Sequence, residues 1–251
     1  LQRRLKNNSD GLTRWIVIRV FVLVFCQFLV NIISSHLFEW HTPGVLSLLA
    51  ICALTSIVIT KLSVRTRLLV LTLISISPLI IAEYFIINLS WSERTSSLDF
   101  YFWISRIFVS GTYPLFPWLS FIILGGLISD LSKNSRIRIE ILFGGASIFI
   151  LLFALINKST WALTSGDALL TFFPASMPFI ITATTGVLLI HEILLSNIKW
   201  NEKSILYRGF IHMGSLSLTI YVLHFIPFSV YELSGIDAQL SILHSFVIII
   251  I

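Results

Sequence analysis

Apolar runs of about bilayer-spanning length recur along the whole chain, and they limit its fold more than any other feature does. About 20 predominantly apolar residues cross the hydrocarbon core of a bilayer as a helix. Such runs lie at residues 15–35, 44–61, 68–89, 113–129, 139–156, 169–194 and 213–233, and an eighth begins near residue 240. The sequence therefore predicts an all-α, polytopic integral membrane protein with about eight transmembrane helices.

Composition agrees with this class. Of the 251 residues, 56% are hydrophobic and only 12% are charged, whereas a soluble domain is about one quarter charged. The loops between the runs are short, and the sequence contains neither an internal repeat nor a low-complexity linker. We therefore expect one transmembrane helical domain over residues 1–251. Because the chain starts without Met and ends inside an apolar run, we expect that domain to be truncated at both ends.

Basic residues alternate between the loops. Thirteen of the 17 Lys and Arg residues fall in four alternate segments: Arg3, Arg4, Lys6, Arg14, Lys61, Arg65, Arg67, Lys133, Arg136, Arg138, Lys199, Lys203 and Arg208. This is the positive-inside pattern, and it predicts that the first residue is cytoplasmic. The external loops are then those at 36–43, 90–112, 157–168 and 234–239. Topology thus explains the net charge of +5 without a nucleic-acid partner, and the predicted partners are membrane lipids.

The segment 112–130, TYPLFPWLSFIILGGLISD, is the most informative stretch. Two prolines stand among aromatic residues at its start, a Gly-Gly pair follows an apolar span, and Asp130 ends it beside a basic loop. Irregular backbone at membrane depth persists only where protein or a water-filled cavity covers it. We therefore predict an irregular external mouth at a cavity, with Tyr113, Pro117 and Trp118 as candidate lining residues.

The external segment 90–112 leaves two interpretations open. Tyr101, Ile104 and Phe108 share one stripe at helical spacing, as in a short amphipathic helix that lies in the membrane interface. An ordinary loop is the alternative.

Polar residues inside apolar spans are costly and often functional. Arg19 lies early in the first span, where it would either snorkel to the cytoplasmic surface or bind an anionic group from that side. Glu83, near the external end of its span, would pair with Arg94 or Arg106 or face an external cavity. His224 lies deeper in LTIYVLHFIPF and is either a packing residue or a cavity-lining residue that orients a ligand or moves a proton.

The external loop SSHLFEWHTP contains His36, Glu39, Trp40 and His41. Two histidines around a carboxylate and a tryptophan would suit hydroxyl binding or acid–base chemistry. A solvated turn is the alternative. The two cysteines fall in apolar spans and no metal-ligand spacing is present, so the sequence predicts neither a disulfide framework nor a metal site.

The segment YPLFPWLSFIILGGLIS resembles a recurring element of the heparan-alpha-glucosaminide N-acetyltransferase catalytic-domain family, including its uncharacterised prokaryotic relatives. Three looser patterns are similar to other parts of that family. They are the basic segment RRLKNNSDGLTRW with the helix that follows it, the stretch PGVLSLLAICALTSIVI, and GSLSLTIYVLH near the end. The resemblance covers most of the chain in order.

The resemblance implies a helical membrane bundle that passes an acetyl group from cytoplasmic acetyl-CoA to an external or lipid-linked sugar. The family's catalytic histidine and its Asp-x-Arg-Gly signature are expected upstream of Leu1, so no residue of this chain is assigned as catalytic. Arg19 becomes the candidate donor-side residue. The candidate acceptor-side or cavity-lining residues are Glu83, Tyr113, Pro117, Trp118, His224 and His36, with Trp103, Asp99 and Asp167 as further external aromatic and acidic groups.

Two other functions stay open at this point. A transporter or flippase-like protein would use proline-broken helices around a central path, and a non-catalytic membrane subunit would pack against partners. An upstream helix with Asp-x-Arg-Gly followed by a membrane histidine would favour the enzyme. Inverted repeats and more charge within the spans would favour the transporter.

Overall fold

The computed structural model describes residues 9–84, 89–97, 99–196 and 205–233, and it is almost entirely helical. The predicted all-α class is confirmed, since the only strands described are two residues long. The elements are α2 (Ser9–Ile33), α3 (Val45–Ile59), α4 (Val64–Tyr84), α5 (Trp91–Thr95), α6 (Phe100–Ser105), the π-helix η1 (Arg106–Ser110), α7 (Leu115–Asp130), α8 (Lys133–Asn157), β1 (Ala162–Leu163), β2 (Leu170–Thr171), α9 (Met177–Ser196), α10 (Ile205–Leu223) and α11 (Phe225–Leu233).

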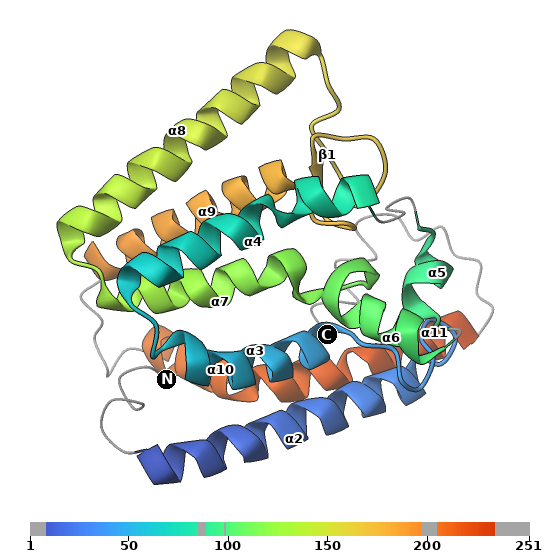
Figure 1. Cartoon of the computed structure of the whole chain (residues 1–251). Coiled ribbons are helices and arrows are strands. Elements are labelled where there is room, and N and C mark those ends of the chain that lie inside the picture. Colours follow the sequence, from blue (N-terminus) through green and yellow to red (C-terminus); the bar gives the residue numbers. More distant parts are fainter. Residues whose placement is uncertain (1–8, 85–88, 98, 197–204, 234–251) are drawn as a thin grey trace.

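The long helices run back and forth between two ends of one bundle (Figure 1). The connections α3–α4 and α7–α8 lie at one end, which we call the basic end because it holds two of the predicted cytoplasmic loops. The segments 34–44, 89–114 and 158–176 gather at the opposite end, which we call the cap end. The described connections therefore fall at alternate ends of the bundle, in the order that the Lys and Arg pattern predicts.

Four described helical spans are long and apolar enough to cross a membrane: Thr13–Ile33, Lys133–Asn157, Met177–Leu194 and Tyr207–Val230. A fifth results if the bent pair Phe100–Ser110 and Leu115–Asp130 is one span. The number is smaller than the eight predicted. α3, with 15 residues, covers only about 22 Å at 1.5 Å per residue, and the predicted eighth run lies outside the described residues. Several long apolar helices indicate a multi-pass membrane protein.

Two apolar clusters hold the bundle together. The larger joins α3, α4, α7 and α9, with Ile123, Leu124 and Leu127 of α7 at most 1% exposed. The smaller joins α2 to α3 through Leu23 and Leu46, with α10 and α11 packed against it. By contrast, the apolar side chains of α8 and α10 are mostly exposed, as expected where helices face lipid.

The entry to α7 has the irregular backbone predicted for it. Pro114 caps the helix, and Phe116 has φ −98° and ψ 120°, outside the helical region. Pro117 explains this conformation, because a proline ring disfavours the helical region for the residue before it. At Gly111 the backbone passes so close to η1 that an added Cβ would overlap the Arg106 carbonyl oxygen. The chain therefore turns sharply from η1 into α7, by 46°.

The predicted span 169–194 is wrong in its first part. Leu170 and Thr171 pair in parallel with β1, and α9 begins only at Met177. The Thr171 hydroxyl donates to the Pro174 carbonyl at 2.7 Å, and the Ser176 hydroxyl donates to the Leu169 carbonyl at 3.0 Å. These local bonds satisfy the backbone in a tight turn instead of a helix. An apolar run alone does not reveal such a turn.

The interior proline of α4 is compensated locally. Pro78 cannot donate to the carbonyl of Ile74, four residues earlier. The Ser77 hydroxyl donates to that oxygen at 2.7 Å instead. We expect Ser77→Ala to lower the free energy of unfolding by about 1 kcal/mol, since one buried acceptor loses its partner. Chemical unfolding in detergent measures this change. Ser77→Thr, which retains the hydroxyl, is the control, and an equal loss in both variants would contradict the explanation.

The described residues of the segment 90–112 are largely helical and do not form an ordinary loop. It contains α5, α6 and η1, and Tyr101 and Phe108 of the predicted stripe are 71% and 38% exposed. Asp99 caps α6 by accepting a hydrogen bond from the Phe102 amide at 2.9 Å. The helical interpretation is thus confirmed, the location in the membrane interface stays a prediction, and Asp99 has a structural role in α6.

Candidate functional site

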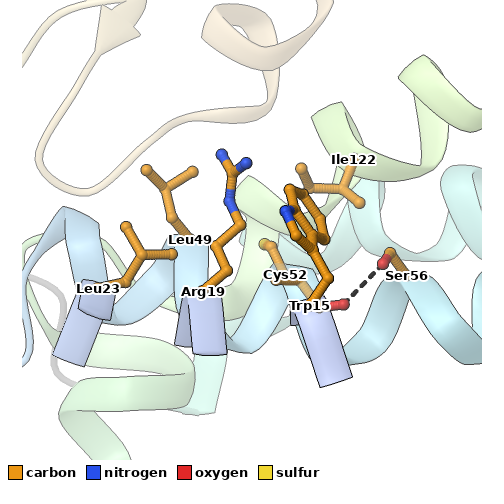
Figure 2. Close-up of a pocket in the computed structure, with 8 residues that line it drawn as sticks. Trp15, Arg19, Leu23, Leu49, Cys52, Ser56 and Ile122 are labelled. Carbon is orange, nitrogen blue, oxygen red and sulfur yellow. Dashed lines mark hydrogen bonds between the residues drawn. The ribbon is translucent and has the colours of Figure 1, made fainter. Parts of the chain in front are cut away.

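A cavity of about 310 Å³ opens between α2, α3 and α7 (Figure 2). Residues from one face of α2 and one face of α3 line it together with Ile122 of α7: Trp15, Arg19, Leu23, Leu49, Cys52, Ala53 and Ser56. The spacing of four along α2 and of three and four along α3 places these side chains on facing stripes. We call this space the Arg19 cavity.

Among the described residues, Arg19 is the only charged one that lines this cavity. Its side chain is exposed, and its guanidinium lies 5.2 Å from the centre of the Trp15 ring, a cation–π contact. No ion pair to Arg19 is present in the described part of the chain. Figure 2 shows the guanidinium extending past Leu49 and Trp15, away from the helix backbone. Arg19 is therefore positioned to contact an anion at the edge of an apolar cavity.

Two other arginines near the basic end bind carboxylates within the bundle. Arg67 of α4 is 4% exposed, donates to Asp130 at 2.7 Å, and also donates to the Gly126 carbonyl at 3.1 Å. Arg136 of α8 donates to Glu192 of α9 at 2.7 Å. Because both guanidinium groups hold helices together, they are structural residues and not free cation sites.

Aromatic rings form a cluster where α7 meets the turn before α9. Trp118 lies 4.9 Å from Phe172 and 5.7 Å from Tyr113, and Phe172 lies 4.6 Å from Phe173. Most pairs are edge-to-face, the favoured geometry. The Trp118 indole N–H is buried and has no hydrogen-bond acceptor among the described residues. The structure thus packs Tyr113 and Trp118 in one aromatic cluster, whereas neither is among the residues that line the two cavities described here.

Next to this aromatic cluster is a second cavity, of about 230 Å³. Five of the chain's seven prolines line it: Pro78, Pro114, Pro117, Pro174 and Pro178. Its two hydroxyl groups already donate to carbonyls of the turn before α9. This proline cavity, which includes the predicted Pro117, therefore presents an almost wholly apolar surface.

A polar group of three residues lies at the cap end. The His41 Nε2 atom is 2.7 Å from the Ser97 hydroxyl and 3.3 Å from a Glu39 carboxylate oxygen. The same carboxylate oxygen accepts the Ser97 amide hydrogen at 3.2 Å. Carboxylate and hydroxyl therefore approach the same ring nitrogen, Nε2, while the Nδ1 atom is buried with no hydrogen-bond partner among the described residues. Nε2 can accept a proton from an O–H group when the imidazole carries its own proton on Nδ1. We call this set the His41 group.

Buried hydrogen bonds fix the loop that carries His41. Asn31 of α2, 1% exposed, donates to the carbonyls of Trp40 and Thr42 at 3.1 and 2.8 Å. The Trp103 indole donates to the His41 carbonyl at 2.9 Å, and the Thr42 hydroxyl donates to the Thr95 carbonyl. The backbone on both sides of His41 is therefore held by three separate elements, and its imidazole is preorganised.

Two buried arginines stabilise the same cap. Arg94 donates to the Ser110 carbonyl at 3.3 Å, and Arg106 donates to the Ser110 hydroxyl at 2.7 Å. Burial, and then the neighbouring charge of Arg106, lower the pKa of Arg94. In the same turn, hydrogen bonds from the Ser90 hydroxyl and amide lower the pKa of Glu93. These contacts tie α5 to η1.

The remaining predicted residues lie apart from one another. His36 is exposed in the loop before α3, and Asp167 is exposed between β1 and β2. His224 lies at the break between α10 and α11, with its ring 4.2 Å from Phe225 and 5.2 Å from Tyr221. The backbone of Glu83 is helical in α4, but its side chain lies outside the described residues.

Sequence reasoning placed Glu39 and His41 in one loop but missed Ser97. Ser97 is 56 residues away from His41, and no motif links the two segments. Asn31 was also missed, because a lone asparagine near the end of an apolar run carries no pattern. The only available signal was the rule that buried polar residues in a span need partners.

The described residues contain no group of three His, Cys, Asp or Glu side chains that could hold a metal ion. Comparisons of the chain with protein-family models, with curated proteins and with solved structures found no match.

Proposed function

We propose that this protein is part of a membrane acyltransferase that passes an acetyl group from cytoplasmic acetyl-CoA to the hydroxyl or amine of an external or lipid-linked sugar. In this proposal the bundle crosses the membrane with about eight spans, the basic end is cytoplasmic, and the cap end is external. The sequence resemblance to membrane N-acetyltransferases supports the reaction class, and the Lys and Arg distribution supports the orientation.

The observation that carries the proposal is the His41 group. Ser97 shows that a hydroxyl oxygen fits at 2.7 Å from Nε2 of His41. An acceptor O–H or N–H in the place of Ser97 could transfer its proton to that nitrogen, and the Glu39 carboxylate at 3.3 Å would stabilise the resulting imidazolium. The deprotonated oxygen or nitrogen would attack the acetyl carbonyl carbon, the bond between that carbon and the CoA sulfur would break, and CoA would leave as the thiolate.

The surroundings suit a sugar. Trp40 is 67% exposed, with its ring 4.8 Å from that of His41, and exposed aromatic rings bind the apolar faces of sugars. The Trp103 indole, which donates to the His41 carbonyl, is a second aromatic ring beside this group. These groups bind an acceptor and orient it without contributing to the proton transfer.

The donor would approach the basic end. Four basic side chains are exposed there: Lys61 in the α3–α4 connection, Arg65 at the start of α4, and Lys133 and Arg138 at the start of α8. A CoA donor is highly anionic, so these four side chains would attract it. A contact between the CoA donor and Arg19 stays a prediction, which is tested by whether acetyl-CoA displaces a lipid bound at Arg19.

The test is acetyl transfer across a membrane. The purified protein is placed in proteoliposomes with carbon-labelled acetyl-CoA at the basic face and an amino sugar at the cap face. We expect labelled acetyl sugar, and a loss of at least about 100-fold in rate for His41→Ala, the range that general bases contribute. Glu39→Gln should lose less, because it retains the side-chain shape.

His212→Ala provides the matched control, because His212 is exposed on α10, away from the cap loops. Its transfer rate should equal that of the unmodified protein. Absence of labelled product from the unmodified protein, or an undiminished rate in His41→Ala, would contradict the proposal.

Transport is the second candidate function. The observation in its favour is the proline cavity, which is lined by the interior proline of α4, the irregular entry of α7 and the start of α9. Solute counterflow in the same proteoliposomes distinguishes the two functions. Movement of unmodified sugar without acetyl-CoA would favour transport over transfer.

A further inference from the structure

The Arg19 cavity combines one cation with apolar walls. Apart from Arg19, its lining groups are aliphatic or aromatic, together with Cys52 and Ser56. The Ser56 hydroxyl already donates to the Ala53 carbonyl at 2.6 Å (Figure 2). A ligand that complements this cavity therefore carries one anionic group and a long apolar part.

The position of Arg19 along α2 places the anionic group at the membrane surface. Arg19 lies six residues past Thr13, where the apolar part of α2 begins, which is about 9 Å at 1.5 Å per residue. An arginine side chain is long enough to bring its guanidinium back to the interface. Trp15, one turn earlier, is a residue typical of that interface. The guanidinium thus lies near the level of lipid phosphates.

An exposed guanidinium at this depth needs an anionic partner. No carboxylate of the described residues pairs with Arg19, and a charge that faces lipid without compensation is unfavourable. A phosphodiester can accept two parallel hydrogen bonds from a guanidinium. Anionic phospholipids are concentrated in the cytoplasmic leaflet, to which the positive-inside pattern assigns this end of α2.

We propose that the Arg19 cavity binds an anionic phospholipid, with the headgroup phosphate on Arg19 and one acyl chain along Leu23, Leu49 and Cys52. The cavity opens between α2 and α3, both of which have exposed apolar side chains facing outward, so lipid can enter from the bilayer. A single guanidinium matches the single net charge of such a lipid better than the several charges of acetyl-CoA. This inference goes beyond acyl transfer and does not depend on it.

Native mass spectrometry tests the site. The purified protein is released from vesicles of equal parts phosphatidylglycerol and phosphatidylcholine, and the retained lipid is identified. We expect one retained phosphatidylglycerol, preferred about tenfold over phosphatidylcholine, which is about 1.4 kcal/mol. Arg19→Gln should abolish the preference, whereas Arg14→Gln, an exposed change on the same helix outside the cavity, should retain it.

Two further measurements separate the alternatives. Leu49→Trp fills the cavity from a residue that is 42% exposed and should reduce lipid retention with Arg19 intact. Addition of acetyl-CoA should leave the retained lipid in place. A preference that survives Arg19→Gln would overturn the proposal, and so would complete displacement by acetyl-CoA, which would assign Arg19 to the donor. Neither outcome changes the result expected in the acetyl-transfer assay, so each proposal can be contradicted without contradicting the other.

Discussion

Replacement of Asn31 by alanine is expected to lower the free energy of unfolding by about 3 kcal/mol. Asn31 is 1% exposed and makes three hydrogen bonds. Its amide donates to the Trp40 and Thr42 carbonyls, and its oxygen accepts from the Gln27 amide at 2.9 Å. In Asn31→Ala, the Gln27 amide and the carbonyls of Trp40 and Thr42 lose these hydrogen bonds. All three bonds are buried or part-buried where α2 contacts the loop before α3.

The measurement is chemical unfolding of the detergent-solubilised variant, accompanied by hydrogen exchange over residues 38–43. Faster exchange is expected there, because the loop carbonyls lose the contacts that hold them. Asn157→Ala is the matched control, since Asn157 is exposed and donates only to the Phe153 carbonyl. If Asn31→Ala unfolds no more easily than Asn157→Ala, the network does not stabilise the loop.

Replacement of Arg67 by alanine is expected to cost a similar amount, about 3 kcal/mol. The guanidinium is buried between α4 and α7, where it donates to Asp130 and to the Gly126 carbonyl. The Asp130 side chain is only 22% exposed. Removing the guanidinium leaves the partly buried Asp130 carboxylate and the Gly126 carbonyl without the donor that they share. The resulting loss of stability exceeds the small free energy that a surface ion pair contributes.

A double-mutant cycle with Asp130→Ala apportions this effect. We expect the double variant to be more stable than the sum of the single effects implies, by about 1 kcal/mol or more. Arg65→Ala is the control, because Arg65 lies two residues earlier in α4 and is exposed; its effect should stay within about 0.5 kcal/mol. Strict additivity of Arg67→Ala and Asp130→Ala would show that the pair is not coupled.

The sequence predicts the helical class and the alternation of the two ends because these depend on local properties. Runs of apolar residues must hydrogen-bond their own backbone in lipid, and the positions of Lys and Arg follow the membrane sides. The prolines around Phe116 likewise predict an irregular start to α7, because their restriction on the preceding residue is local. These predictions agree with α2, α8, α10 and the entry of α7 as observed.

The span boundaries were less predictable. The run at 169–194 reads as one apolar segment, yet the bonds of Thr171 and Ser176 fold its first residues into a turn. Those bonds join residues within a few positions, and the same segment pairs with β1, a contact between separate parts of the chain. Hydropathy records how apolar a residue is, and it carries no information on whether a nearby hydroxyl replaces a helical hydrogen bond.

The candidate site likewise has features that the sequence predicts and features that only the tertiary structure reveals. The sequence by itself determined the membrane class and the presence of Glu39 and His41 in one loop, because each follows from neighbouring residues. Only the tertiary structure decided that Ser97 lies beside His41 and that Arg19 faces Leu49 and Cys52 across a cavity. Such contacts join residues that are tens of positions apart, and they form because helix packing buries apolar faces, a constraint that no local pattern records.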